Sequence, residues 1–326
     1  MLASFKPSSS NAYILASLMI AHVYFVRRFP APGESLQAEN FYGETGGKGL
    51  NVLVGLHKLA VPVNGILPCG YHPTSQQQLQ HILAEWQLNH ITPAIIAEHN
   101  GHGVALIDAQ GQNQIIIFPG ANALLGEADI QRQTAHIQQA DLTYAPFELP
   151  DAAIIAAFSI ARAANRMTVL NPSPYRTINP TLLAVTDVLI MNQTEAQAWL
   201  NGSPEHFSTR STTLAWLRHI QFNQRFPGKS LVITLGDQGV VALLEDGSIH
   251  QQEAFDTQVV DSIGAGDAFA SAFLASLLQG NHLSTALQYG CASASLCIRQ
   301  SGLLAHLPTR DILQSFLSGQ GSGTNS

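Results

Sequence analysis

The sequence has few charged residues and few aromatic residues, and each shortage argues against a nucleic-acid partner. Charged residues make up 11% of the 326 residues and the formal net charge is −7. No segment gathers Lys and Arg into the basic patch that a nucleic-acid-binding surface normally needs. Aromatic residues are 7% of the chain and scattered, so no platform for stacking bases is expected either.

Cysteine is almost absent, which excludes a disulfide scaffold. The three cysteines are Cys69, Cys291 and Cys297, and neither a C-x-x-C pair nor an H-E-x-x-H motif occurs. The thirteen histidines are dispersed, and no zinc ligand set is expected among them. Such a chain fits a reducing compartment, so a cytoplasmic protein is expected.

A membrane-spanning run of about 20 apolar residues is also missing. The longest apolar stretch is residues 12–26. An apolar stretch preceded by a basic residue, here Lys6, is also typical of a signal peptide. However, Arg27 and Arg28 follow it and no small-x-small cleavage site is evident. The stretch therefore favours a buried strand that runs on toward a hairpin, and no membrane partner is expected.

What the sequence does contain is a regular alternation of short apolar segments and helical segments. Helices are expected over 151–165, 194–201 and 211–223. The expected strands lie in the segments "YILASLMI", "DLTYAPF", "MTVLNPS", "DVLIMN" and "SLVITLG". Short apolar strands separated by helices indicate βαβ units. The fold expected is α/β, a Rossmann-like, mostly parallel sheet with helices on both faces.

Two hairpin-like stretches do not fit that sheet and predict a separate β lid. They span roughly 23–46 and 98–120, where runs of β-forming residues flank turn residues. The main α/β domain would then consist of 1–22, 47–97 and 121–326. Within it, the Gly- and Ser-rich residues 318–326 are expected to form a flexible tail.

The glycine cluster "ETGGKGLNV" suggests a phosphate-binding P-loop but does not satisfy that motif. With Gly47-Lys48 as its Gly-Lys pair, a P-loop needs glycine where Tyr42 stands and Ser or Thr where Gly49 stands. The cluster leads instead into a helix, and glycines there would let a small polar ligand approach the backbone. Asn51 offers both a donor and an acceptor, which suits hydroxyl groups. A plain tight turn is the alternative.

A second cluster, "VVDSIGAGDAFASAFLASLLQG", predicts a turn at Gly264-Ala265-Gly266 followed by a helix from Ala268 to about Gln279. Backbone N–H groups at such a turn can hold an anion, aided by the helix dipole. A carboxylate at Asp267 could accept the proton of an attacking hydroxyl in phosphoryl transfer. The alternative is that Asp267 only caps the helix.

Together the two clusters resemble the two signatures of the PfkB carbohydrate kinases, the ribokinase-like family. The segments "FPAPGESL", "VLNPSPYRTINPTLLAVTDVLIMNQTEAQAWLNG" and "VITLGDQGV" add to the likeness. It runs from about Tyr13 to Pro308 and is strongest to the ribokinase branch. The resemblance implies an ATP- and Mg²⁺-dependent kinase, with a sugar or sugar-like acceptor and a homodimer formed through the lid.

The resemblance also implies roles for particular residues. Asp267 would be the catalytic base. Acceptor hydroxyls would be held by Gly47, Lys48, Asn51 and Glu148. The nucleotide side would comprise Asn192, Thr234, Gly236, Gly239, Gly264, Ala265 and Gly266, with Glu195 organising hydrated Mg²⁺. A monovalent-cation site for K⁺ would use Asp261, Ile263, Cys297, Gln300 and Gly302. For Asn192 and Glu195, a helix capping box is the alternative account, and the two roles are compatible.

The chain departs from the family pattern in two places. Met19 and Ala21 stand where the family carries Asn and Asp that grip the sugar, so an acceptor less polar than ribose, or bound differently, is expected. His22 could compensate, although adjacent strand residues face opposite ways. His306 replaces a serine ligand of the cation site, which leaves K⁺ dependence open. A nucleoside kinase and a non-catalytic sugar- or nucleotide-binding relative are the alternatives.

Overall fold

The structure is a computed structural model that describes residues 10–220, 225–300 and 302–321. The strands are β1 (Ala12–Leu15), β2 (Met19–Phe25), β3 (Asn40–Gly46), β4 (Val63–Gly70), β5 (Ile91–Ala97), β6 (Gly101–Ile107), β7 (Asn113–Phe118), β8 (Leu142–Pro146), β9 (Met167–Asn171), β10 (Val188–Asn192), β11 (Ser230–Thr234), β12 (Val240–Leu244) and β13 (Ile249–Gln252). The helices are α1 (Lys48–Lys58), α2 (Pro73–Glu85), α3 (Glu127–Gln131), α4 (Thr134–Gln139), α5 (Asp151–Ala163), α6 (Pro180–Ala184), α7 (Gln193–Leu200), α8 (Arg210–Leu217), α10 (Ala265–Leu278), α11 (Leu283–Cys297) and α12 (Arg310–Gly321). None of the helices in these ranges has the length and apolar character needed to cross a membrane.

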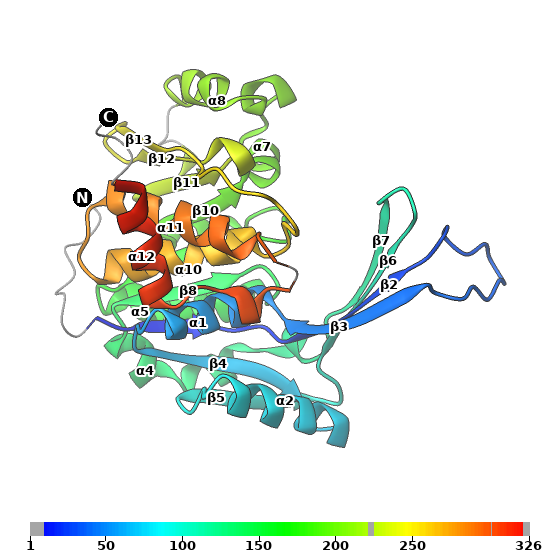
Figure 1. Ribbon diagram of the computed structural model, residues 1–326. Helices are drawn as coiled ribbons and strands as arrows, with labels where there is room; N and C mark the ends of the chain where they lie inside the picture. The colour runs from blue at the N-terminus through cyan, green and yellow to red at the C-terminus, as the bar shows by residue number, and fades with distance from the viewer. Residues whose placement is uncertain (1–9, 221–224, 301, 322–326) are drawn as a thin grey trace.

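Nine strands form one sheet in the order β13-β12-β11-β10-β9-β8-β1-β4-β5 (Figure 1). All neighbours from β11 to β5 are parallel, while β12 and β13 add an antiparallel edge. The central strands are buried along nearly their whole length, as in "LTYAP" of β8. Such runs suit a sheet that is covered on both faces. The predicted α/β fold is therefore confirmed.

The helices cover both faces of the sheet and create two apolar cores. One core packs α1, α2, α10, α11 and α12 against the sheet and includes Leu53, Ile82 and Phe273. The other packs α3 to α8 against the opposite face and includes Phe158 and Leu217. This three-layer arrangement leaves the carboxyl ends of the strands as an edge along which loops gather.

Four strands form a separate sheet, in the order β3-β2-β6-β7, that projects from the body at the right of Figure 1. We call this sheet the lid. Strand β2 begins at Met19, so the lid starts earlier than residue 23. The strand expected over 13–20 is in fact divided into β1 and β2. The Asn122 side chain holds Leu18 at this break, since its Oδ1 accepts from Leu18 N at 2.9 Å and its Nδ2 donates to Leu18 O at 2.8 Å. A side chain thus replaces a neighbouring strand as partner of the backbone.

Other helix ends differ from the sequence expectation. Helix α10 begins at Ala265 rather than Ala268, because Gly264 adopts a left-handed conformation and precedes it directly. Helix α8 ends at Leu217, and residues 221–224 of the helix expected there lie outside the described residues. Residues 318–321, expected to be a flexible tail, belong to α12. Residues 322–326 lie outside the described ranges.

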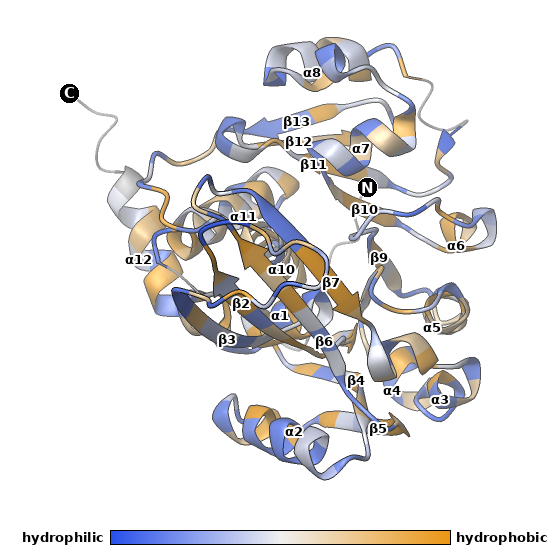
Figure 2. Cartoon of the chain, turned by 90° about the vertical axis from the view of Figure 1, so that its right-hand side faces the viewer, coloured by the Kyte–Doolittle hydropathy of each residue, from blue (hydrophilic) through white to orange (hydrophobic). Residues whose placement is uncertain are grey.

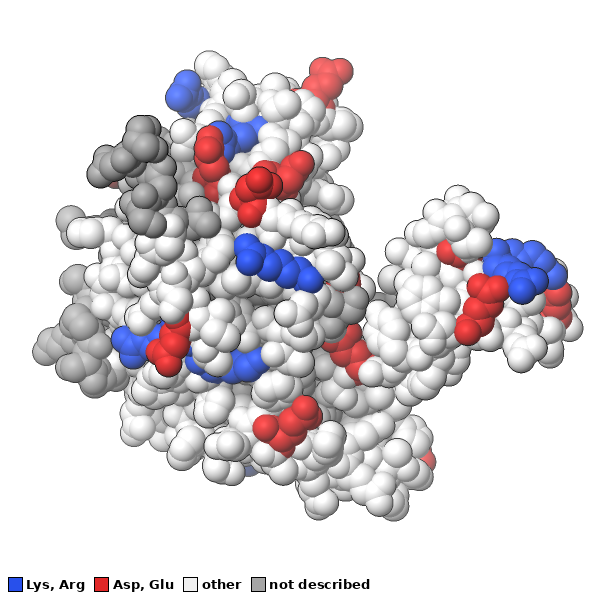
Figure 3. Space-filling model, in the orientation of Figure 1, with Lys and Arg blue, Asp and Glu red and all other residues white. Residues whose placement is uncertain are grey.

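On the face of the molecule shown in Figure 3, Lys and Arg side chains are scattered rather than gathered into one basic patch. Basic and acidic side chains lie together on the projecting lid. The pairs Arg27–Glu39 and Arg28–Glu34 belong to the loop between β2 and β3 at the lid's outer end. The surface in view thus agrees with the even distribution of charge along the sequence.

Candidate active site

Strands β1 and β8 lie side by side in the middle of the sheet, and the chain leaves them in opposite directions. It continues from β1 toward β4 and β5 on one side, and from β8 toward β9 and β10 on the other. Such a switch point is where open α/β sheets bind ligands. Ser17 follows β1, Glu148 follows β8, and the Ser17 hydroxyl donates to Glu148 Oε2. Glu148 was expected from the sequence, whereas Ser17 was not, because a single serine in an apolar stretch forms no motif.

The glycine cluster lies directly against the chain that leaves β1. Gly47 is the N-cap of α1 with φ of 116°, and a Cβ there would come within 2.2 Å of Ser17 O. A Cβ at Gly49 would come within 2.6 Å of Ala16 Cα. The glycines are therefore required for close backbone packing. This packing places the N-terminus of α1 at the switch point, where Lys48 N donates to Glu148 Oε2 at 2.7 Å.

Asp267 meets that turn from the opposite side. Its side chain lies in the first turn of α10 and is 4% exposed. Asn51 Nδ2 donates to Asp267 Oδ2 at 2.7 Å, while Lys48 Nζ lies 3.9 Å from Asp267 Oδ1. Within the described part of the chain, nothing donates a hydrogen bond to the buried Asn51 Oδ1. The structure thus joins the two glycine-rich clusters into one polar site.

The charges in this site influence one another strongly. The Asp267 carboxylate, followed by Glu148 and Glu195, raises the pKa of Lys48 against the opposing effect of burial. Burial raises the pKa of Glu148, and the hydrogen bonds from Ser17 and from the backbone of Lys48 oppose that rise. The Lys48 ammonium, 3.9 Å from Asp267 Oδ1, pairs with the charge of that buried carboxylate. Lys48 therefore stays protonated in this site.

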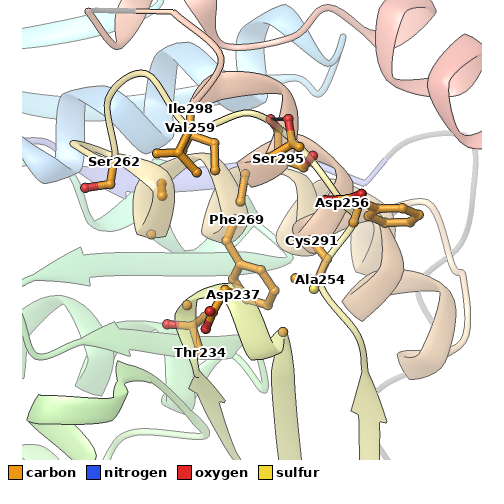
Figure 4. Close-up of a pocket in the computed structure, with 17 residues that line it drawn as sticks. Thr234, Asp237, Ala254, Asp256, Val259, Ser262, Phe269, Cys291, Ser295 and Ile298 are labelled. Atoms are coloured by element: carbon orange, nitrogen blue, oxygen red, sulfur yellow. Dashed lines mark hydrogen bonds between the residues drawn. The ribbon is translucent and has the colours of Figure 1, made fainter.

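A cavity of about 470 Å³ adjoins the start of α10 (Figure 4). Its lining includes Thr234, Gly236 and Gly239 from the β11–β12 connection, and Ala265 and Gly266 from α10. The walls also carry apolar side chains from α10 and α11, among them Phe269, Cys291 and Ile298. No atom lies within 4 Å of a Cβ placed at Gly236 or Gly266, so both backbones face open space. A mostly apolar pocket with a bare backbone at one end suits a planar ring that carries an anionic group.

Asn192 and Glu195 form the capping box of α7. Asn192 Oδ1 accepts from Glu195 N at 2.9 Å, and Glu195 Oε2 accepts from Asn192 N at 2.9 Å. Asn192 is exposed, whereas Glu195 is buried. The capping account is thus confirmed, and it leaves room for a second role because the Glu195 carboxylate also influences Lys48. Gly264 lies at the N-cap of α10 with φ of 76°.

The residues expected to hold a monovalent cation come from two adjacent segments. Val260 N and Asp261 N donate to Ile298 O at 2.8 and 3.2 Å, which ties this loop to the end of α11. Asp261 Oδ1 accepts from Ile263 N at 2.9 Å. Cys297 is buried beside the loop, and Gln300 and Gly302 follow. Residue 301 lies outside the described residues.

Met19 and Ala21 lie at the root of the lid, and His22 does not take their place. Met19 pairs with Gly46 and Ala21 with Glu44 across the β2–β3 ladder. The ring of His22 stacks against Phe41 with centroids 5.9 Å apart. Phe41 pairs with Tyr24, so it shares the face of His22 and not that of Met19. His22 therefore faces away from the two apolar side chains.

The fold and the site together define a class of protein. At the switch point, a cluster of polar side chains and a buried carboxylate at a helix start lie next to a cavity with bare backbone. These are the parts of a phosphotransferase that acts on an alcohol. Residues 10–310 match the model of the pfkB family carbohydrate kinases. The chain therefore belongs to this family, whose members transfer a phosphoryl group to a hydroxyl, and the recognition made from the sequence is confirmed.

Individual relatives agree with that membership. A ribokinase of Staphylococcus aureus (strain COL) is 29% identical over 308 residues, which cover 92% of this chain and 97% of the relative. A deoxyribokinase of Salmonella typhi is 24% identical over 94% of this chain and 98% of its own. The solved structure of Arabidopsis thaliana ribokinase complexed with ribose and ATP has a TM-score of 0.83 at 24% identity, covering 95% of this chain and 99% of that one.

Proposed function

We propose that this protein is an ATP-dependent kinase that phosphorylates a hydroxyl group of a sugar or sugar-like small molecule. The hydrogen bond between Asn51 Nδ2 and Asp267 Oδ2 carries the proposal, because it joins the acceptor turn to the helix start that would face the phosphate. The similarity to ribokinases, one of them solved with ribose and ATP, supports ATP as the phosphoryl donor and a sugar-like alcohol as the acceptor.

In this proposal Asp267 is the general base. Asn51 holds one carboxylate oxygen, whereas Oδ1 is 3.9 Å from Lys48 Nζ, too far for a hydrogen bond. Oδ1 can therefore accept the proton of the acceptor hydroxyl while that oxygen forms a bond to the γ-phosphorus of ATP. The bond between the γ-phosphorus and the bridging oxygen breaks, and ADP leaves.

The acceptor would be oriented by the groups around that base. The Asn51 Oδ1, buried and without a donor among the described residues, can accept from one acceptor hydroxyl. Lys48 and Glu148 supply an ammonium and a carboxylate on the same side. These groups, with the backbone at Gly47, would hold two or more hydroxyls of a polyhydroxylated molecule.

The nucleotide would occupy the cavity beside α10. The backbone N–H of Gly266 belongs to the first turn of the helix, where no intrahelical partner is available, whereas Ala265 N donates to Ser262 O at 3.3 Å. The N–H of Gly266 would stabilise the charge that builds up during phosphoryl transfer. Mg²⁺, held through water near Glu195 and Asn192, would neutralise phosphate charge when bound. The loop of Asp261 and Ile263 would hold K⁺ together with backbone groups of Cys297, Gln300 and Gly302.

The proposal extends to a homodimer in the cytoplasm. Apolar residues run along β2, β6 and β7 of the lid (Figure 2), and Phe41, Ile116 and Phe118 are each more than half exposed. A second lid is a suitable cover for such a surface. The three cysteines are buried and unpaired, which fits a reducing compartment.

The direct test replaces Asp267 with Asn, which keeps an oxygen for Asn51 but cannot accept a proton. We expect Asp267→Asn to lower turnover at least about a hundredfold, as for loss of a general base. Calorimetry should show unchanged ATP binding. Asp246→Asn, on the exposed β12–β13 turn, is the control. Near-normal turnover in Asp267→Asn would refute the base, and no ADP release by the wild type with any sugar or nucleoside would refute the kinase.

A nucleoside is the second candidate for the acceptor. One observation favours it, namely that the lid surface facing the site is apolar near its root, where Met19 and Ala21 lie. Such a surface could pack a base. An ADP-release assay that compares pentoses and hexoses with nucleosides separates the two classes.

A further inference from the structure

Backbone pairing identifies which face of the lid is turned toward the active site. A Cβ at Gly46 of β3 would come within 3.2 Å of Asn51 Oδ1. On the same strand, Glu44 Oε1 accepts from Leu303 N at 2.6 Å, on the body. Side chains alternate along a strand, and residues directly paired across a ladder share a face. Gly46, Glu44 and their partners Met19 and Ala21 therefore line what we call the cleft face.

Near the body, the parts of the cleft face that belong to β2, β6 and β7 are apolar, and β3 carries its polar side chain. Met19 and Ala21 of β2 pair with Gly101 and Gly103 of β6, respectively. On β7, Ile117 pairs with Gly103. None of these side chains can donate or accept a conventional hydrogen bond. Glu44 on β3 is the polar side chain of this face near the body, and one of its carboxylate oxygens, Oε1, accepts from Leu303 N.

The Met19 corner is packed so that it offers no hidden polar group. A Cβ at Gly101 would lie 2.4 Å from Met19 Sδ, so the thioether occupies the space that glycine leaves. Asn122 Nδ2 lies 3.3 Å from the same sulfur. Both ends of that amide are engaged by the backbone of Leu18. Asn122 therefore cannot replace the missing hydrogen-bonding groups of residue 19.

Beside this corner there is room for a ligand. No heavy atom lies within 4 Å of a Cβ placed at Gly103, and Ala21, its partner on β2, is also small. Ile117 on β7 is 60% exposed and flanks the same spot. Open space beside Gly103, Ala21 and Ile117 therefore lies on the cleft face, the face on which Gly46 meets Asn51.

We propose, resting on the kinase function above, that the acceptor is an alcohol with two unlike sides. Its hydroxyls face Lys48, Asn51 and Asp267, and a side without hydroxyls faces Met19, Ala21 and Gly103. A hydroxyl pressed against Met19, Ala21 and Gly103 would lose its water and gain no partner. Met19 and Ala21 are then specificity-determining residues that select deoxygenated or ring-bearing acceptors over fully hydroxylated pentoses.

The experiment measures both turnover and binding, so that each proposal can fail separately. The panel comprises D-ribose, 2-deoxy-D-ribose, 3-deoxy-D-ribose, methyl β-D-ribofuranoside, uridine and adenosine. ADP release gives kcat/KM, and calorimetry with the Asp267→Asn variant gives affinity. At least one acceptor with an apolar side should exceed D-ribose by about tenfold to a hundredfold, the range that an apolar pocket achieves against an added hydroxyl. The deoxypentose, glycoside and nucleoside arms identify which apolar group is used.

Variants locate the selectivity on the lid. Met19→Asn with Ala21→Asp places hydrogen-bonding groups on the cleft face and should shift the ranking toward D-ribose by at least about tenfold. Val104→Asn makes the same kind of change on the opposite face of β6 and should leave the ranking unchanged. A wild type that prefers D-ribose, or a double variant with the wild-type ranking, would overturn this inference. If no compound is phosphorylated, the kinase proposal fails. The order of the calorimetric affinities for the panel then still tests whether the site prefers molecules with an apolar side.

Discussion

At the scale of single residues, the glycine cluster serves the packing of the backbone as well as the ligand. A Cβ at Gly49 would overlap Ala16 Cα and Leu15 O, both at 2.6 Å. These are backbone atoms of the segment that leaves β1, so they cannot turn away as the end of a side chain could. The first turn of α1 is thereby held where Lys48 N reaches Glu148. The position of the acceptor site thus depends on a residue with no side chain.

We therefore expect Gly49→Ala to destabilise the fold although alanine favours a helix. Overpacking costs roughly 1–3 kcal/mol or more, against a gain of about 1 kcal/mol in helix propensity. Gly319→Ala in α12 is the matched control, since a Cβ there meets no atom within 4 Å. Urea unfolding should show a lower midpoint for Gly49→Ala and an equal or higher midpoint for Gly319→Ala. A Gly49→Ala protein as stable as the wild type would contradict the steric argument.

The sequence allowed Asp267 and Asn51 to be placed in one site because two distinctive clusters occur in a family order. It could not reveal Ser17, since a lone serine in an apolar run has no motif. Nor could it show that Asn51 Nδ2 contacts Asp267 directly, because that contact depends on how α1 and α10 pack. Side-chain contacts between distant elements are set by packing, which composition and spacing do not encode.

At the scale of elements, helix α7 serves two purposes with one pair of residues. Its capping box satisfies backbone groups at both Asn192 and Glu195. The same carboxylate is 6% exposed and influences the pKa of Lys48, so its charge is felt in the site. Capping needs only an oxygen acceptor at residue 195, whereas organising Mg²⁺ needs the negative charge. The two roles can therefore be separated by mutation.

Glu195→Gln retains the cap acceptor and removes the charge. We expect it to cost less than about 1 kcal/mol of stability but to raise the Mg²⁺ concentration for half-maximal activity about tenfold, as for loss of an outer-shell metal partner. Asn192→Ala removes the cap oxygen and should cost about 1 kcal/mol. The measurements are thermal unfolding and an Mg²⁺ titration of ADP release. An unchanged Mg²⁺ requirement in Glu195→Gln would assign the pair to capping alone.

Element positions were predictable where the pattern was strong and failed at their ends. The central strands and α5 follow from apolar runs between turn signals. The division of the first strand into β1 and β2 was missed, because apolar residues continue on both sides of Ser17 and a single serine does not indicate a break. The break arises from Asn122, far along the chain, whose amide takes over the hydrogen bonds of Leu18. A contact between such distant residues leaves no trace in the local pattern.

At the scale of the whole molecule, the lid has two faces with different tasks. The cleft face begins at Met19. The outer face carries Phe41, whose ring centroid lies 5.9 Å from that of His22 and 5.1 Å from that of Tyr24. Ile116 pairs with Val104 on that outer face and is 72% exposed. The sequence predicted a lid from its hairpins, but the pairing of β2 with β6 that joins them came from the structure. That pairing is what gives the lid a continuous outer surface.

If the outer face covers a second copy, a charge in its centre should separate the protomers. Ile116→Asp would bury an unpaired carboxylate at the interface, so we expect its dimer dissociation constant to rise at least about thirtyfold, a loss of roughly 2 kcal/mol. Ile312→Asp makes the same change at a site that is 53% exposed on α12 of the body and should leave association unaltered. Sedimentation velocity over a range of concentrations measures both. A wild type that stays monomeric at about 50 μM, far above typical stable-dimer constants, or equal dissociation of both variants, would show that the lid does not form the interface.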